Sequence, residues 1–196
     1  MSEEDPAKKP ENRSKKRRQP LKATPEALER SALYYLDRYD TASGHLRRLL
    51  MGKVTLSARL HGTDPAEGAA AVERLVQRFL KAGVLDDARF ARERVRSLRA
   101  RGTSRAMVRA RLQAKGVAST LIDEALAGEE APARDLAAAV TYAKRRRLGP
   151  FRLDERAERR AKDLAALGRQ GFDYETAQRV IDCEDVEELL ARLPQD

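Results

Sequence analysis

The sequence predicts an all-α protein made of three tandem three-helix repeats that form an elongated, curved array. The first observation is composition, because the 196 residues include 32 Ala and 24 Leu but only 10 Val and 2 Ile. Helices favour Ala, Leu, Arg, Glu and Lys, whereas strands favour β-branched and aromatic residues. The second observation is a series of helical apolar periods separated by caps and glycines. The third is an internal repeat.

The first repeat is expected over residues 24–84 and contains three helices. Thr24 can cap a helix, and Pro25 fits its first position because the missing N–H would be unpaired there anyway. The basic and apolar connection over 51–63 is expected either to extend the second helix or to insert an irregular turn. The boundary signals in this repeat are, in order, Thr24–Pro25, Thr41 or Ser43, Asp64–Pro65 and Gly83.

The second and third repeats are expected over residues 85–129 and 130–183. In both, capping side chains precede apolar periods and glycines follow them, which is typical of helix starts and ends. A short acidic helix or tail over 184–196 is expected to follow. The boundary signals are Asp86–Asp87, Gly102, Ser104, Gly116, Ser119, the linker Gly128–Pro132, Gly149–Pro150, Asp154, Gly171 and Asp173.

Internal similarity supports this division. The segment Leu112–Val117 aligns with Leu167–Phe172 at an offset of 55 residues (167 minus 112), which places Gly116 and Gly171 at the same position. Tandem helical repeats contact mainly their sequence neighbours and expose a long curved surface. Such a surface suits an extended partner better than a small ligand.

The formal net charge of +9 indicates an anionic partner, either nucleic acid or an acidic protein surface. Residues 1–22 contain 8 Lys and Arg against 4 Asp and Glu, a net of +4, and they include few apolar side chains. Such a segment cannot bury enough apolar surface to offset its ordering entropy, so we expect a disordered basic tail over 1–23. The other 174 residues (196 minus 22) carry the remaining +5. An arginine-rich coding bias is an alternative origin for part of this excess.

Arginines are concentrated between Ala88 and Arg111, where nine of them accompany a single acid, Glu93. On a helical wheel, a stripe of four arginines falls within about 80° beside an apolar face, namely Arg89, Arg92, Arg96 and Arg99. A solvated basic face is the alternative interpretation. A second basic run, over 144–147, ends an expected helix and exceeds what pairing with the helix dipole needs. The candidate partner- or phosphate-binding residues are Arg89, Arg92, Arg96, Arg99, Arg105, Arg109, Lys115, Lys144, Arg145, Arg146 and Arg147.

The chemistry-bearing residues are not arranged for catalysis or for metal binding. Asp86 and Asp87 are adjacent, so on a helix their carboxylates diverge and suit capping better than acid–base chemistry. His45 and His61 lack further ligands at zinc spacing. Cys183 lies among acids, which disfavour a thiolate, and a phosphate-binding P-loop is absent from the sequence. We therefore expect a protein that is not an enzyme and needs no cofactor.

The middle repeat carries a series of motifs, namely Leu85–Ala91, Arg101–Ser104, Val108, Leu112, Lys115–Val117, Leu121–Ile122 and Ala125–Leu126. These motifs resemble those of a known family, RecX, the regulatory protein of the RecA recombinase. Two later motifs, Ala143–Pro150 and Arg169–Asp173, are similar to the third repeat of RecX proteins from alphaproteobacteria. The resemblance extends over roughly residues 25–182.

The resemblance implies a curved fold of three tandem three-helix repeats and no catalytic residue. It also implies a protein that lies in the helical groove of the RecA filament on single-stranded DNA, restrains filament growth, and lowers ATP hydrolysis and strand exchange during DNA repair and recombination. We expect a cytoplasmic monomer without membrane contact, and direct contact with DNA phosphates stays open.

A stand-alone basic helical DNA-binding protein is the alternative function, since three-helix units also occur in helix-turn-helix proteins. This alternative predicts tight, steeply salt-dependent DNA binding in the absence of the recombinase. The two hypotheses therefore differ in whether the recombinase is needed for an effect.

Overall fold

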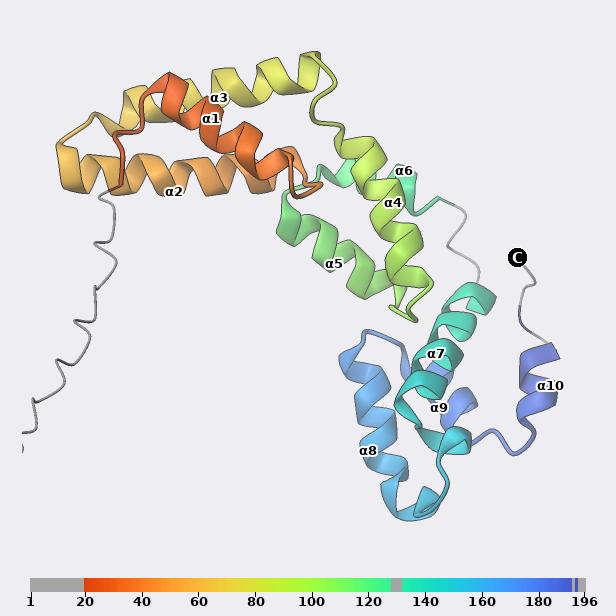
Figure 1. Ribbon diagram of the computed structural model, residues 1–196. Coiled ribbons are helices and arrows are strands. Elements are labelled where there is room, and N and C mark those ends of the chain that lie inside the picture. The colour runs from red at the N-terminus through yellow and green to blue at the C-terminus, as the bar shows by residue number, and fades with distance from the viewer. Residues whose placement is uncertain (1–19, 128–131, 192, 194–196) are drawn as a thin grey trace, which may run out of the picture.

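The computed structural model describes residues 20–127, 132–191 and 193, and all regular elements in these ranges are helical. The helices follow one another as three sets of three along a bent line, with a further short helix at the C-terminal end (Figure 1). The predicted all-α fold of three tandem three-helix repeats is therefore confirmed. The elements are α1 (Pro25–Leu36), α2 (Ser43–His61), α3 (Pro65–Lys81), α4 (Asp87–Arg99), α5 (Arg105–Lys115), α6 (Ser119–Ala125), α7 (Pro132–Arg146), the 3-10 turn η1 (Gly149–Phe151), α8 (Arg156–Arg169), α9 (Tyr174–Ile181) and α10 (Val186–Ala191).

Each set of three helices encloses its own apolar core. Leu46 and Val76 are buried at the centre of the first core, between α2 and α3. Leu112 and Ile122 occupy the second core, and Leu167 lies in the third. Because each core is local, the chain is a linear array of units rather than one large core.

Most helices begin where local capping predicts. The Thr24 hydroxyl accepts a hydrogen bond from the Ala27 N–H at 3.3 Å, and Pro25 occupies the first turn of α1. The Ser104 hydroxyl accepts from the Met107 N–H at 3.1 Å at the start of α5. Three predicted aspartate caps also form, namely Asp64, Asp86 and Asp173.

Two predicted caps are wrong. Ser119 is the first residue of α6 rather than its cap, and the preceding Ala118 has no polar side chain with which to cap the helix. The start of α8 follows Glu155 rather than Asp154, and Glu155 has a left-handed backbone with φ 51°. Its carboxylate accepts from Nε of Arg159 at 3.0 Å, so it is held beside a cation rather than beside backbone N–H groups.

The uncertain connection over 51–63 continues the second helix. α2 runs without interruption to His61 and ends at Gly62, whose φ of 64° suits a residue without Cβ. Near its end, the buried Ser57 hydroxyl accepts hydrogen bonds from the Ala23 N–H at 3.0 Å and from the Thr63 hydroxyl at 2.9 Å. These bonds hold the segment that precedes α1 against the far end of α2.

The two ends of the chain are described in part. The predicted tail over 1–23 lies outside the described residues except for 20–23, and so does most of the predicted linker Gly128–Pro132. The predicted acidic C-terminal helix is present as α10, and Asp185 Oδ1 accepts from the Glu187 N–H at 2.9 Å in its first turn. Among the described helices, none is both long and apolar enough to cross a membrane.

Asp163 fixes the turn between α7 and α8. Its buried carboxylate accepts hydrogen bonds from the Gly149 N–H at 2.9 Å and from two nitrogens of Arg152 at 2.9 and 3.1 Å. Burial raises the pKa of this carboxyl, but the bonds from Arg152 and Gly149 outweigh that effect and hold the pKa below its usual value. The ionised carboxylate therefore holds η1 against α8.

Candidate partner-binding surface

The exposed face of α4 carries most of the predicted arginine stripe. Arg92 and Arg96 lie one helical turn apart, and neither forms a hydrogen bond or ion pair within the described ranges of the chain. Arg89 is also exposed, and its guanidinium approaches Oδ1 of Asp40 only to 3.7 Å. Exposed guanidinium groups that are unpaired or only loosely paired within the protein can form bidentate hydrogen bonds with the carboxylates or phosphates of a partner.

Arg99 has a different role from the one the helical wheel predicts. Its side chain is only 9% exposed and forms a salt bridge with Asp135 in the first turn of α7. It also donates to the Thr103 carbonyl at 2.9 Å. The wheel is correct in placing Arg99 on the α4 stripe, but the third set of helices covers this end of the helix. Arg99 is therefore part of the contact between the second and third sets.

The candidate basic residues of α5 are less exposed, or more often paired within the protein, than Arg89, Arg92 and Arg96 of α4. Arg109 pairs with the exposed Asp123 of α6, which neutralises part of its charge. Arg105 is half-buried, and its backbone N–H donates to Asp135 Oδ1 at 3.0 Å. Lys115 is half-buried at the end of the helix. The α5 residues therefore add less accessible charge than the α4 arginines.

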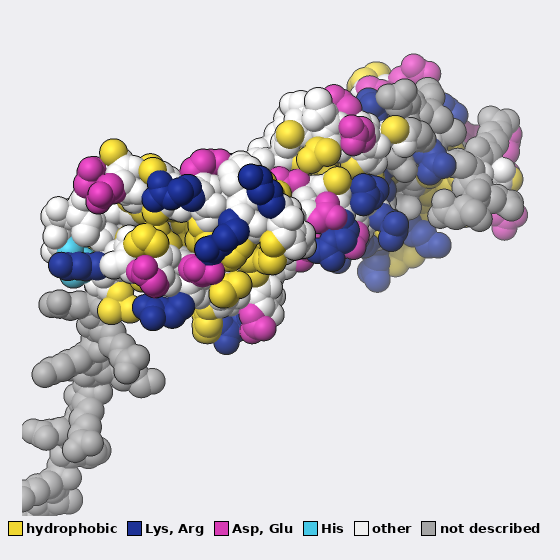
Figure 2. All heavy atoms as spheres, turned by 90° about the horizontal axis from the view of Figure 1, so that it is seen from above, with side chains coloured by type: hydrophobic (Ala, Val, Ile, Leu, Met, Phe, Trp, Pro, Cys, Tyr) yellow, Lys and Arg dark blue, Asp and Glu magenta, His cyan; other side chains and the backbone are white. Residues whose placement is uncertain are grey.

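All four residues of the second basic run are exposed. Lys144, Arg145 and Arg146 complete the last turn of α7, and Arg147 follows with a left-handed φ of 54°. Within the described residues, none of these four pairs with an acid, and Arg145 lies over the Tyr142 ring at 5.7 Å. Figure 2 shows Lys and Arg side chains on both parts of the molecule, including several close together beyond the first set of helices. The end of α7 therefore presents four adjacent cations to solvent.

Asp87 joins the first and second sets of helices. Its carboxylate accepts hydrogen bonds from the Ser43 N–H at 2.7 Å and from the Ser43 hydroxyl at 2.6 Å, at the N-terminus of α2. Beside this contact, a Cβ on Gly44 would come within 2.5 Å of the Gly116 carbonyl oxygen. The two backbones touch here, so the relative placement of the two sets has little freedom.

The second junction repeats this arrangement. Asp135 stands in the first turn of α7 and accepts from the N–H of Arg105, at the N-terminus of the second helix of the preceding set. Gly171, which ends the second helix of the third set, packs against Ser104. The Ser104 hydroxyl donates to the Gln170 carbonyl at 2.5 Å. Equivalent positions therefore build both junctions, which gives the array a regular geometry.

We call Asp87 and Asp135 the junction aspartates, and helical periodicity alone does not reveal them. The sequence does contain one signal, because Asp86 is sufficient to cap α4 and leaves its neighbour Asp87 without a local role. Asp135 then stands in the first turn of the corresponding helix of the next repeat. Their hydrogen-bond partners are 44 and 30 residues away, beyond the reach of any spacing argument.

His45 lies at the first junction, close to two cations. Partial burial lowers the pKa of its imidazole, and the positive charges of Lys115 and Arg48 lower it further. The neutral form of His45 is therefore favoured. Arg48 itself is held at the junction by a hydrogen bond to the Ala114 carbonyl at 2.6 Å.

We expect the protein to lose stability as the pH falls from 7 to about 5.5, because the ordinary pKa of histidine is about 6.5. The pKa of His45 is lower in the folded protein than in the unfolded chain, so the unfolded chain takes up the proton first. The contribution of neutral His45 to the free energy of unfolding is complete above about pH 6.5. It is lost as the pH falls through the pKa that His45 has in the folded protein. Urea unfolding of wild type and His45→Gln at both pH values, with His61→Gln for comparison, measures this. Equal losses in wild type and His45→Gln would contradict the expectation.

The fold defines a class, the helical-repeat proteins, in which each unit contacts mainly its neighbours in the sequence. A family profile described as "RecX, second three-helix domain" matches residues 86–126. The chain is 38% identical over 179 residues to "Regulatory protein RecX" of Myxococcus xanthus, covering 90% of this chain and 94% of that protein. It is 34% identical over 167 residues to the protein of the same name from Agrobacterium fabrum, covering 84% and 88%. The chain belongs to the RecX family of regulatory proteins.

Solved structures show the same fold. The crystal structure of RecX from Lactobacillus salivarius aligns with a TM-score of 0.55 and 16% identity, covering 85% of this chain and 97% of that one. A second crystal structure, described as regulatory protein RecX, aligns with a TM-score of 0.57 and 20% identity, covering 81% and 74%. At these identities the likeness concerns the helical arrangement alone.

Proposed function

We propose that this protein binds the RecA filament on single-stranded DNA and inhibits its ATP hydrolysis, its growth and strand exchange. Membership of a family of regulatory proteins supports a regulatory role. The observation that carries the proposal is the exposed pair Arg92 and Arg96 on a helix whose neighbours are held by the junction aspartates. A nucleoprotein filament offers acidic side chains and phosphates at repeated intervals, which a regular basic array can contact.

Inhibition follows from binding without any catalytic group on this chain. A ligand shifts a conformational equilibrium only by the difference in its affinity for the two states. An array with fixed junctions fits one spacing between neighbouring filament subunits better than another. Binding across subunits therefore favours that spacing, and it opposes the changes that accompany ATP hydrolysis and subunit addition.

Charge reversal at Arg92 and Arg96 is expected to raise the concentration for half-inhibition of the DNA-dependent ATPase at least tenfold. Hydrogen bonds to charged groups contribute about 1.5–3 kcal/mol each, and every 1.4 kcal/mol is about a factor of ten. The matched control is the double variant Arg59→Glu/Lys81→Glu, which makes the same charge change on exposed residues of the first set. Arg99 is left unchanged because of its buried salt bridge.

The expected result is strong inhibition by wild type and by the control, with weak inhibition by a folded Arg92→Glu/Arg96→Glu variant. Circular dichroism establishes that the variants fold. Inhibition by that variant at the wild-type concentration would overturn the assignment of the α4 arginines. An absence of inhibition by the wild-type protein would overturn the proposed function itself.

Binding to DNA alone distinguishes the alternative function. A stand-alone DNA-binding protein is expected to bind duplex DNA tightly at physiological salt, with a steep loss of affinity as salt rises. The proposed function predicts weak binding to free DNA beside clear inhibition of the recombinase. Measuring both at one salt concentration separates the two functions.

A further inference from the structure

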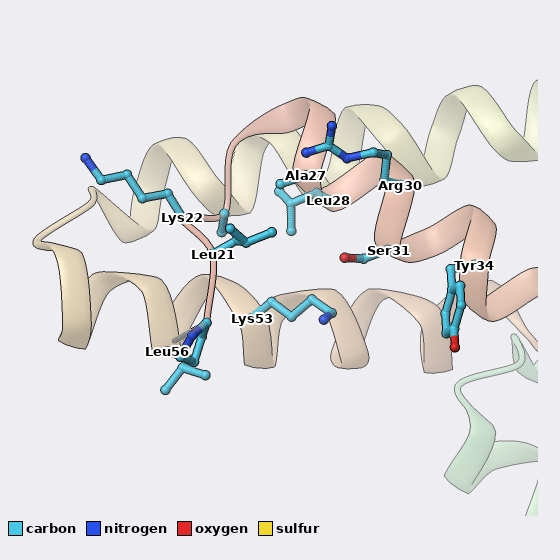
Figure 3. A pocket seen from close by; sticks show the side chains of 11 residues that line it. Leu21, Lys22, Ala27, Leu28, Arg30, Ser31, Tyr34, Lys53 and Leu56 are labelled. Carbon is cyan, nitrogen blue, oxygen red and sulfur yellow. The ribbon is translucent and has the colours of Figure 1, made fainter. Parts of the chain in front are cut away.

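A groove lies on the first set of helices, between the segment 20–23, α1 and α2 (Figure 3). It encloses about 400 Å³ and is lined mainly by apolar side chains. Figure 3 shows Leu21 beside Leu28 at one end of the groove and Tyr34 at the other. Ser31 points into the space between them, and Lys53 runs along the side formed by α2. The groove is built from the first set of helices, whereas α4 belongs to the second set.

The groove exposes apolar side chains that an isolated protein would normally bury. Leu21 is 78% exposed, Tyr34 is 66% exposed and Leu56 is 41% exposed. A concentration of large exposed apolar side chains around one hollow is typical of an interaction site. The segment that carries Leu21 is held in place by the bond from the Ala23 N–H to Ser57, so the groove is already formed in the single chain.

The charged residues that line the groove are all basic. Lys22, Arg30 and Lys53 line it, and its lining residues include no acid. Within the described part of the chain, Lys22 and Lys53 form neither a hydrogen bond nor an ion pair, whereas Arg30 interacts with Glu26 one turn earlier on α1. An occupant that matches these features has an apolar side chain next to carboxylates.

The opposite end of the array carries a segment with that chemistry. On α10, Leu190 is 41% exposed, and the exposed Glu187 precedes it by three residues, on the same face of the helix. Glu188 adds a further exposed carboxylate. Leu189, in contrast, is buried against the third core and anchors the helix. Figure 1 shows α10 at the opposite end of the molecule from α1 and α2, which form the groove.

We propose that α10 of one copy docks in the groove of a second copy, with Leu190 between Leu21 and Tyr34 and with Glu187 paired with Lys53. The two surfaces are different and lie at opposite ends of the chain, so the contact is heterologous and joins copies head to tail. A six-residue helix covers little surface, so the association is weak, with self-association at roughly 0.1 mM and above. The contact goes beyond the proposed function and does not require the recombinase.

Analytical sedimentation of the full chain tests this contact. Two variants are used, each of which alters one of the two surfaces that meet in the contact. Lys53→Glu alters the groove and leaves α10 intact, whereas Leu190→Asp alters α10 and leaves the groove intact. Each variant alone is expected to remain monomeric. An equimolar mixture is expected to form dimers and no larger species, because only one native groove and one native α10 can meet. Wild type is expected to form longer chains, and 0.5 M salt is expected to weaken them by screening the ion pairs.

Lys81→Glu is the matched control, since it makes the same charge change on an exposed residue of α3 and is expected to associate like wild type. Wild type that remains monomeric up to about 1 mM, ten times the expected threshold, overturns the proposal. Association of either altered variant at the wild-type concentration overturns it equally, and it then indicates another surface. None of these outcomes depends on recombinase inhibition, so the proposed function is tested separately.

Discussion

Replacing Asp135 with Ala is expected to lower the free energy of unfolding by about 3 kcal/mol, the lower end of the range for removing one partner of a buried ion pair. The change removes the carboxylate from beside the Arg99 guanidinium, whose side chain is only 9% exposed. It also removes the acceptor for the Arg105 N–H at the start of α5. The lower end applies because the Asp135 side chain is 25% exposed and water partly replaces it. Urea unfolding followed by circular dichroism measures the loss.

Asp123→Ala provides the matched control, since it also removes an aspartate from an arginine pair. Asp123 is 59% exposed where it meets Arg109, so its loss is expected to cost less than about 1 kcal/mol. Asp135→Asn is expected to fall between the two, because the amide oxygen can still accept from the Arg105 N–H. Equal losses in Asp135→Ala and Asp123→Ala would show that the junction ion pair contributes nothing beyond an ordinary surface pair.

The helices of this protein could be predicted because their boundaries depend on neighbouring residues. Thr24 and Pro25 are adjacent in the sequence, and the hydrogen bond that caps α1 spans only three residues. The prediction that Asp154 caps α8 is wrong for an equally local reason, because Glu155, with its left-handed backbone, lies between Asp154 and the start of the helix. A left-handed Glu carries no signal in its residue type, in contrast to the glycines that end α2 and α5.

The candidate surface could be predicted only where no other unit covers it. Helical spacing predicts that Arg92, Arg96 and Arg99 share one face of α4, and they do. Whether that face meets solvent depends on where the third set of helices lies, and Arg99 finds its carboxylate 36 residues further along the chain. Contacts of this separation follow from the packing of repeats against each other. Spacing within a helix contains no information about them.

Glycines also differ in whether they meet only their own helix or another set of helices. Gly102 meets another set, and it is the glycine at which we expect one added methyl group to have the largest effect. Gly102 has a φ of 73°, and a Cβ there would come within 2.5 Å of the Tyr142 backbone nitrogen and 2.6 Å of the Ala138 carbonyl oxygen. Gly102→Ala is expected to cost about 2–5 kcal/mol, because about 1–2 kcal/mol arises from the left-handed backbone and about 1–3 from overpacking. Both obstructing atoms belong to the backbone of α7, so no side-chain rotation can relieve the overlap.

Gly62→Ala separates these two contributions. Gly62 also has a left-handed φ, 64°, but nothing lies within 4 Å of the position of an added Cβ. Its replacement is expected to cost only the backbone part, about 1–2 kcal/mol, and to leave recombinase inhibition unchanged. Gly102→Ala displaces the third set of helices from the second, so it is expected to weaken inhibition in the ATPase assay even where circular dichroism shows a folded protein. Equal stability losses and equal inhibition by the two variants would mean that the close approach of Gly102 to α7 does not fix the geometry of the array.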